Sequence, residues 1–444
     1  MSDETRQAQR PAAPLRLELN SPYRMNIPML LLTVVLICYG LIILFSASMA
    51  TGYANTQNPL SYVLNQGRWT IIGIMLCAVL VFIPVRIYDH IGFVVPVYFL
   101  TLALVVYTKF KGEIIGGSRR WIVIGGQTFQ TSEFAKIALI FCIAGYRSFT
   151  LRLRKKGKLV CKTRRGQSYL DAIVDIFLPA MMLLVCLVFV FLQPHMSFFI
   201  IMLTVSFICF LVSGIPLKRW IDGGLMLVLV LLIGANGFMT FTSFEQKQDL
   251  LGNYQHVLTR LDIFAAMSDE GASSETDEKT TDSSTADENE VYQSKQSRIA
   301  IGSGGLFGVG FGNSRQKYKY LPEAHNDYVF AIACEELGFV GGVSIILLFL
   351  AFMAGGYAVA WHTKGVFSRI MCVGYTSLIT IQAFLNIAVA IGAIPPTGIT
   401  LPFFSYGGTA NLFFLIAVGI ILAISRTGLA RKKQVISIRS EDIE

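Results

Sequence analysis

Three ionisable side chains stand together in the segment from Leu321 to Tyr328, which ends a long polar stretch and opens an apolar one. Glu323, His325 and Asp327 lie where water gives way to lipid, and ionisable groups at such a boundary are costly and mark candidate functional sites. A carboxylate there can act as a general base, and we select Asp327 for that role. The alternative is that Asp327 only caps the helix that follows, because an Asp oxygen accepts backbone N–H groups at a helix start.

The composition bounds the class of protein. Of the 444 residues, 54% are hydrophobic and 15% are charged, whereas soluble domains carry about 25% charged residues. The chain is therefore an integral membrane protein. Its net charge of +9 is scattered over short segments between apolar runs, so membrane topology explains it and no nucleic-acid partner is expected. The eight cysteines show neither metal-ligand spacing nor a disulfide framework.

Apolar runs of spanning or near-spanning length determine the predicted fold. It is an all-α integral membrane protein, a polytopic bundle of about ten transmembrane helices with one large extracellular loop. The Lys and Arg distribution predicts that both termini are cytoplasmic. We expect an N-terminal tail at 1–27, a transmembrane domain at 28–425 and a C-terminal tail at 426–444. The runs lie near 29–45, 69–85, 91–107, 134–149, 171–192, 196–213, 221–241, 327–361, 367–391 and 409–425.

An external loop at about 108–133 supplies a second group of candidates. It carries Arg120 and Trp121 and leads into Glu133 and Lys136. The last two are three residues apart at a predicted helix start, so they can pair on one face. The alternative for Arg120 and Trp121 is an interfacial anchor, because Arg and Trp favour headgroup depth.

The largest soluble part of the chain is the external loop at 242–326. Its segment 268–290 is acidic and lacks large apolar side chains, which predicts a disordered insertion. Order is expected to resume at Gln296 and Ser297. The glycine-rich stretch that follows, with Gly304 and Gly305, permits positive φ and close backbone approach, as an anion-cradling loop needs. No Walker Lys-Ser/Thr pair follows, so a nucleotide P-loop is not expected.

The last external segment, 386–408, is apolar but rich in helix breakers and contains Ser405, Tyr406 and Gly407. Non-helical backbone at membrane depth is tolerated only where protein or a water-filled cavity satisfies it, so we expect a re-entrant loop that lines a cavity. The other intramembrane charges are few and, apart from Lys136, unmatched in sign, whereas a proton-coupled transporter more often has a chain of them. These charges are Asp175, Asp222, Glu335 and Glu336.

Four motifs, in this order along the predicted helices, resemble the SEDS family (shape, elongation, division and sporulation), most closely its FtsW and SpoVE branch. The resemblance covers about residues 25–430. Three departures from the family pattern occur, at Thr131, at 195–197 and at Asn326 with Tyr328, but the carboxylate at Asp327 is retained. The motifs are Arg120-Trp121 with Gln130, Glu133 and Lys136; Gln193-Pro194; the glycine-rich loop with Pro322-Glu323-Ala324-His325 and Asp327; and Pro402-Phe403 with Ser405-Tyr406-Gly407-Gly408.

The resemblance implies a peptidoglycan glycosyltransferase that polymerises lipid II at the outer face of the plasma membrane, in cell division or sporulation and at the division septum. It implies a class B penicillin-binding protein and other divisome proteins as partners, besides membrane lipid. Asp327 is then the catalytic base. No cofactor is assigned with certainty, and a divalent cation, Mg or Mn, is left open. The implied substrate-binding residues are Arg120, Trp121, Glu133, Lys136, Gln193, Ser297, Gly304, Gly305, Glu323, His325, Ser405, Tyr406 and Gly407.

Two other functions remain open from the sequence. A lipid II flippase would use the same cavity and the same substrate, and a scaffold would only activate its partner. Sequence does not separate binding from turnover. Formation of strands from purified lipid II in detergent, where no leaflets exist, would distinguish a polymerase from both of these alternatives.

Overall fold

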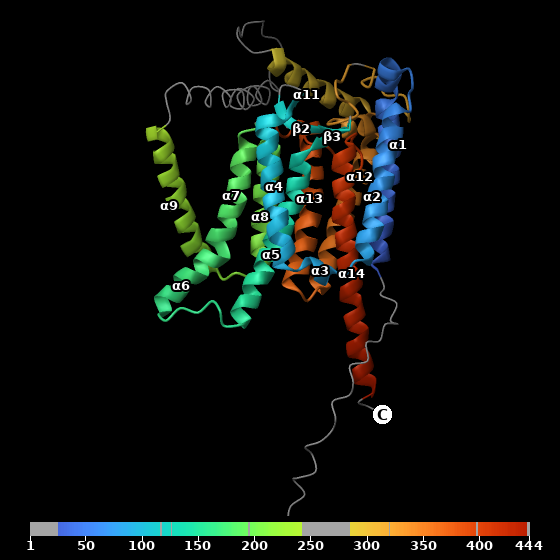
Figure 1. Ribbon diagram of the computed structural model, residues 1–444. Coiled ribbons are helices and arrows are strands. Elements are labelled where there is room, and N and C mark those ends of the chain that lie inside the picture. Colours follow the sequence, from blue (N-terminus) through green and yellow to red (C-terminus); the bar gives the residue numbers. More distant parts are fainter. Residues whose placement is uncertain are drawn as a thin grey trace, which may run out of the picture.

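The computed structural model describes residues 25–115, 118–125, 127–193, 196–241, 285–318, 320–396 and 398–441. It is a bundle of long helices with a small sheet at one end (Figure 1). The helices are α1 (Ile27–Thr56), α2 (Ser61–Phe82), α3 (Val85–Tyr88), α4 (Ile91–Lys111), α5 (Thr131–Lys155), α6 (Arg164–Ala172), the π-helix η2 (Ile173–Phe177), α7 (Leu178–Phe191), α8 (Met196–Val212), α9 (Leu217–Phe241), α11 (Thr285–Ser303), α12 (Val329–His362), α13 (Val366–Ala390) and α14 (Gly408–Glu441).

Within the described residues, eight helices are long and apolar enough to cross a membrane. They are apolar nearly all round, as expected where the surroundings are lipid or other helices. The polytopic membrane fold predicted from the sequence is confirmed. The count of ten stays a prediction: of the two remaining apolar runs, one forms the shorter stretch Ser197–Val212 of α8 and the other forms α9.

The core lies around α13, which packs against α5, α8, α12 and α14. α14 also packs along α2, and small residues allow the close approach. A Cβ on Gly73 would lie 2.4 Å from Leu415 Cδ1, and one on Gly419 would lie 2.9 Å from Cys77 Cα. Such small-residue contacts are how membrane helices gain packing where lipid gives no hydrophobic driving force.

A three-stranded antiparallel sheet stands where the sequence predicted a loop. Its strands are β1 (Glu113–Ile115), β2 (Ser118–Ile124) and β3 (Gln127–Gln130), in the order β1-β2-β3. The run of β-branched residues at the end of β2 favours a strand. In Figure 1 the sheet and α11 lie at one end of the bundle, opposite the end of α14. The sheet therefore positions Arg120 and Trp121 of β2 at that end.

Two predicted boundaries differ from the observed elements. Most of the segment 268–290, predicted to be disordered, lies outside the described residues, but α11 already begins at Thr285, before the predicted return of order at Gln296. The predicted C-terminal tail begins inside a helix, because α14 continues to Glu441.

Candidate functional site

Asp327 lies two residues before α12, at the end of the segment that the sequence singled out. The N-cap of α12 is Tyr328, and it makes no side-chain capping bond. Among the hydrogen bonds of the described residues, none involves the Asp327 carboxylate. The alternative that Asp327 serves as the helix cap is therefore wrong.

Hydrogen bonds to three consecutive carbonyl groups hold the backbone of residues 325–327 in place. Tyr406 N donates to the His325 carbonyl at 2.9 Å, the Ser405 hydroxyl donates to the Asn326 carbonyl, and Asn386 Nδ2 donates to the Asp327 carbonyl at 2.7 Å. The donors come from the turn before α14 and from α13. Asp327 is thus fixed through its main chain while its carboxylate stays available, which is the preorganisation that a reacting group needs.

The surroundings of Asp327 raise its pKa to about 7. Burial is the largest cause, because a low-dielectric environment penalises the charged form, and the negative charge of Glu323 adds to the rise. The positive charge of Arg120 acts in the opposite direction. A carboxyl whose pKa lies near neutral pH is suited to general-base catalysis, because it is both ionised and basic under working conditions.

Arg120 reaches the site from the sheet. Its Nε lies 3.5 Å from the carbonyl of Gln193, whose own side chain is buried and donates to the Val105 carbonyl at 2.9 Å. Trp121 pairs with Gln130 in the β2–β3 register. Gln193 therefore orients Arg120 through its main chain, and its amide is already occupied.

Glu133 and Lys136 form the predicted pair at the start of α5. Lys136 Nζ lies 2.7 Å from Glu133 Oε1 and 2.6 Å from Gln382 Oε1, and Lys136 is 3% exposed. A buried ion pair is stable only when further hydrogen bonds complete it, and Gln382 supplies one. The ammonium of Lys136 thus has two oxygen partners for its three N–H donors, and its predicted contact with substrate stays a prediction.

Two amides on α13 belong to the site but were missed by the sequence reasoning. Gln382 Nε2 donates to the carbonyl and the hydroxyl of Thr400, both at 3.2 Å. Asn386 Nδ2 donates to the Ile399 carbonyl at 2.6 Å as well as to Asp327. They lie one helical turn apart and hold the non-helical segment against the bundle. Polar residues four apart in an apolar span were the available signal.

The glycine-rich loop packs against α12, and the predicted anion-cradling role of its glycines stays a prediction. α12 is kinked at Gly338, where φ is 69°, and the loop replaces the helical bonds lost there. Val309 N donates to the Glu335 carbonyl at 3.0 Å, and Phe339 N donates to the Gly305 carbonyl at 2.8 Å. A Cβ on Gly304 would lie 2.1 Å from the Cys334 carbonyl oxygen. Gly304 and Gly305 therefore serve the fold of α12.

The remaining predicted residues divide between two roles. Ser297 is buried and donates to the Ala390 carbonyl at 2.7 Å, so it ties α11 to α13. Ser405 accepts from Leu401 N at 2.7 Å in addition to its bond to Asn326, so its hydroxyl is also occupied. Gly407 N donates to Gln66 Oε1 at 3.1 Å. By contrast, Glu323 and His325 lie in the segment that ends at Asp327, the Tyr406 ring lies 6.0 Å from that of His325, and all three keep polar groups available.

The intramembrane carboxylates that the sequence left unmatched all have partners. Glu336 pairs with Lys317 at 2.8 Å, and Glu335 accepts from Ser314 and Arg315 N. Asp222 accepts weakly from Ser168 at 3.4 Å. For Glu336 and Asp175 the prediction that no matching cation exists was wrong, because the cations lie on other elements. Asp175 in η2 meets three arginines: Arg147 at 2.7 Å, Arg154 at 3.0 Å and Arg219 at 2.7 Å.

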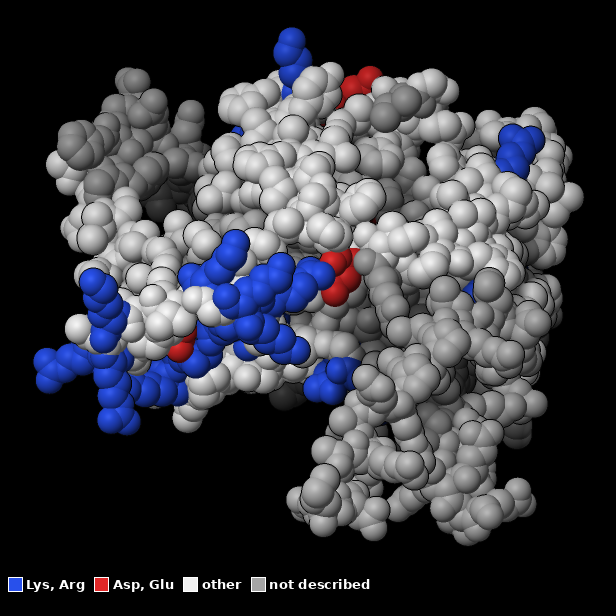
Figure 2. Space-filling view, turned by 60° about the horizontal axis from the view of Figure 1, so that its bottom comes forward, with Lys and Arg blue, Asp and Glu red and all other residues white. Residues whose placement is uncertain are grey.

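The opposite end of the molecule is basic. The connection between α5 and α6 lies at that end (Figure 1), and the space-filling view of the end shows Lys and Arg side chains gathered together with few acidic ones (Figure 2). Basic residues gathered at one end are what the topology prediction expects of the cytoplasmic side. The exposed basic residues of this connection are Lys155, Lys156, Lys158, Lys162, Arg164 and Arg165.

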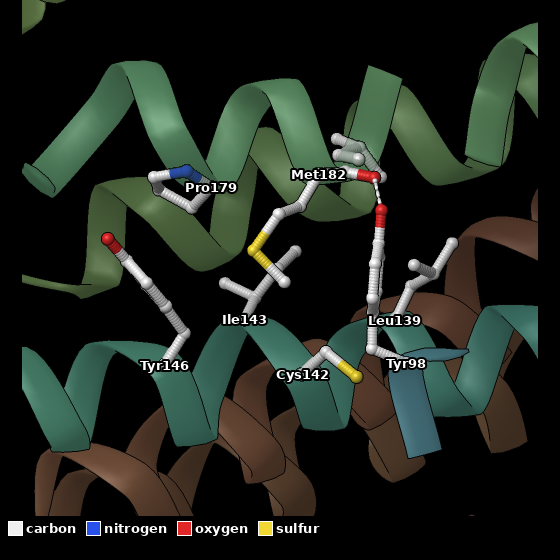
Figure 3. Close-up of a pocket in the computed structure, with 8 residues that line it drawn as sticks. Tyr98, Leu139, Cys142, Ile143, Tyr146, Pro179 and Met182 are labelled. Carbon is white, nitrogen blue, oxygen red and sulfur yellow. Dashed lines mark hydrogen bonds between the residues drawn. The ribbon is translucent and has the colours of Figure 1, made fainter. Parts of the chain in front are cut away.

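A small apolar groove lies between α4, α5 and α7 (Figure 3). It is lined by residues such as Leu139, Ile143 and Leu183, and the Tyr98 hydroxyl donates to the Met182 carbonyl beside it at 3.0 Å. It contains none of the predicted site residues. Among the described residues, no three His, Cys, Asp or Glu side chains gather where they could hold a metal.

The chain is similar to known proteins along most of its length. The sequence pattern of the family described as "Cell cycle protein" (FtsW, RodA, SpoVE) matches residues 27–429. Stage V sporulation protein E of Bacillus subtilis (strain 168) is 31% identical over 403 residues, which is 90% of this chain and 96% of that protein. A probable peptidoglycan glycosyltransferase FtsW of Geobacter sp. (strain M18) is 29% identical over 399 residues, which is 89% of this chain and 95% of the relative.

Solved structures share the fold. One chain, from work on "structural coordination of polymerization and crosslinking by a peptidoglycan synthase complex", superposes with a TM-score of 0.61 at 22% identity, covering 91% of this chain and 98% of the other. The rod shape determining protein RodA of Thermus thermophilus superposes with a TM-score of 0.58 at 23% identity, covering 90% of this chain and 97% of RodA.

Proposed function

This chain belongs to the FtsW, RodA and SpoVE family of cell cycle proteins, and from that premise we propose that it is a peptidoglycan glycosyltransferase. It polymerises lipid II into glycan strands at the outer face of the plasma membrane. The observation that carries the proposal is Asp327: a carboxylate with a pKa near 7, fixed by its main chain and under the field of Arg120.

The reaction needs one base and a cation for the leaving group. A sugar hydroxyl attacks the anomeric carbon of a second molecule, a new C–O bond forms, and the bond to the lipid pyrophosphate breaks. Asp327 takes the hydroxyl proton, and the pyrophosphate leaves without needing a proton, so one carboxylate suffices where glycoside hydrolysis needs two. A single displacement inverts the anomeric centre.

Arg120 is the cation that this chain supplies to the leaving pyrophosphate. A guanidinium matches phosphate oxygens with two parallel N–H bonds and stabilises the charge that develops on them. Any divalent cation, Mg or Mn, would enter with the pyrophosphate, and Glu323 is the exposed carboxylate placed to help hold it. Lys136 acts indirectly: it donates a hydrogen bond to Gln382, whose amide in turn holds the segment at Thr400.

The orientation follows from charge. We place the basic face of Figure 2 and both termini in the cytoplasm, supported by the positive-inside rule. The sheet, α11 and Asp327 then face outward, where lipid II is used. We place the protein at the division septum with a class B penicillin-binding protein and other divisome proteins as partners. A crosslinking partner is supported by the structural neighbour from a peptidoglycan synthase complex.

Polymerisation by the purified protein tests the proposal. In detergent no leaflets exist for a flippase to act on, so glycan strands made from purified lipid II require turnover. Asp327→Asn keeps the shape of the side chain and removes the basic oxygen, and we expect a rate lower by about a hundredfold or more.

The matched control is Asp89→Asn, at a carboxylate that pairs with Arg152 at 3.0 Å and lies in neither the site nor the sheet. This variant is expected to polymerise at the wild-type rate. Normal strands from Asp327→Asn protein, or none from the wild type with a folded protein that binds lipid II, would refute the proposal.

A further inference from the structure

Three aromatic rings from three separate elements meet at the segment that leads to Asp327. Tyr62 lies at the start of α2, His325 precedes α12, and Tyr406 precedes α14. The Tyr62 ring centroid lies 4.6 Å from that of His325 and 4.9 Å from that of Tyr406, both edge to face. An edge-to-face contact covers only one face of one ring, and Tyr62 and Tyr406 are only half-buried. Aromatic surface therefore remains for a ligand.

The polar groups of this cluster are incompletely paired. Asn55 Nδ2 donates to the Tyr62 hydroxyl at 3.2 Å, and Asn65 Nδ2 donates to the Tyr406 hydroxyl at 2.6 Å. Each phenol oxygen thus accepts a bond, and among the described residues neither hydroxyl proton has an acceptor. A phenol can do both, so two donors remain unassigned.

His325 adds a third unassigned group. It is 7% exposed, and its Nδ1 is buried without a hydrogen-bond partner among the described residues. Burial lowers the pKa of His325 although Glu323 acts in the opposite direction, so the site favours the neutral ring. A buried polar atom without a partner is unfavourable, and a ligand that supplies the partner would relieve that cost.

The cluster is rigid. Gln66 is fully buried on α2 and clamps the turn before α14, donating to the Ser405 carbonyl at 3.3 Å and accepting from Gly407 N at 3.1 Å. The same turn holds the His325 and Asn326 carbonyls. The rings are therefore positioned by the same turn that holds the backbone leading to Asp327.

We propose that Tyr62, His325 and Tyr406 form a pyranose-binding subsite that takes an N-acetylhexosamine ring of the substrate. The C–H face of a sugar packs on aromatic rings, and its hydroxyl and acetamido groups pair with the two phenol protons and the imidazole, the mixture of apolar walls and few polar groups typical of ligand sites. This inference rests on the proposed function and adds to it the residues that bind the sugar.

Binding in the absence of turnover tests the subsite. The full chain carrying Asp327→Asn is titrated with lipid II and, separately, with undecaprenyl pyrophosphate, which keeps the lipid and the pyrophosphate but lacks the sugars. Tyr62→Phe and Tyr406→Phe each remove one donor and keep the ring, so each is expected to weaken lipid II binding about fivefold, as the loss of one hydrogen bond predicts. Binding of undecaprenyl pyrophosphate should not change.

Tyr53→Phe is the matched control, because it makes the same substitution at the end of α1, where Tyr53 is 60% exposed and lies outside the cluster. It should leave both affinities unchanged. Unchanged lipid II affinity in the Tyr62→Phe, Tyr406→Phe double variant, or an equal loss for both lipids, would overturn the subsite. Sugar-selective binding by a wild-type protein that makes no strands would instead keep the subsite and refute the glycosyltransferase.

Discussion

The ionisation of Asp327 makes the rate of polymerisation depend on pH in a way that the structure specifies. With a pKa of about 7, about one eleventh of Asp327 is ionised at pH 6 and about ten elevenths at pH 8, since each pH unit changes the ratio of the two forms tenfold. If the ionised form is the base, the rate rises about tenfold between those pH values and then levels. An Asp with its ordinary pKa of 3.8 would give no change over that range.

Two charge-removing variants test the cause of the raised pKa of Asp327. Glu323 raises the pKa of Asp327 and Arg120 lowers it, so Glu323→Gln should move the midpoint of the pH–rate profile to lower pH and Arg120→Gln should move it to higher pH. Glu113→Gln is the matched control, because Glu113 is an exposed carboxylate of β1 at the same end of the molecule. Its profile should coincide with that of the wild type.

The assay is the initial rate of strand formation from purified lipid II in detergent, at saturating substrate. Each variant is followed from pH 5.5 to 9 at constant ionic strength, because salt screens exposed charges such as Glu323. A flat wild-type profile between pH 6 and 8 would refute the assignment of Asp327 as the titrating base. Midpoints that move in the same direction for Glu323→Gln and Arg120→Gln would refute the electrostatic account.

Other parts of the molecule give further expectations. Lys317→Met leaves Glu336 buried and unpaired, so we expect a loss of about 3–5 kcal/mol in stability, visible in thermal melting and reduced when Glu336→Gln is added. Gly308→Ala would place a Cβ 2.1 Å from the Glu336 carbonyl oxygen and should also lower the melting temperature; an unchanged value would contradict the packing of the loop on α12. Deletion of 270–288 should leave polymerisation largely intact, and a hundredfold loss in a folded protein would show that this segment has a working role. A cysteine at Lys156 should be labelled only from the cytoplasm, so labelling from outside would reverse the topology.

The sequence by itself determined the class of fold and the catalytic candidate. Apolar runs of spanning length have few stable alternatives, because backbone groups in lipid must pair within helices, and nearly every predicted run matches a helix. Asp327 could be selected because an ionisable group at a lipid boundary is rare. The pairing of Glu133 with Lys136 followed from local helical spacing and is confirmed at 2.7 Å.

Only the tertiary structure decided what surrounds these residues. Ser405 and Asn326 are 79 positions apart, and Gln66 and Gly407 are 341 apart, so no local period predicts their bonds. The same holds for the three arginines around Asp175 and for the packing of the glycine-rich loop on α12, where glycine allows the two backbones to approach closely. The pKa of Asp327 likewise depends on burial and on charges brought together by folding. Helix formation is decided within a few residues, whereas the partners of buried polar groups are decided by which helices meet.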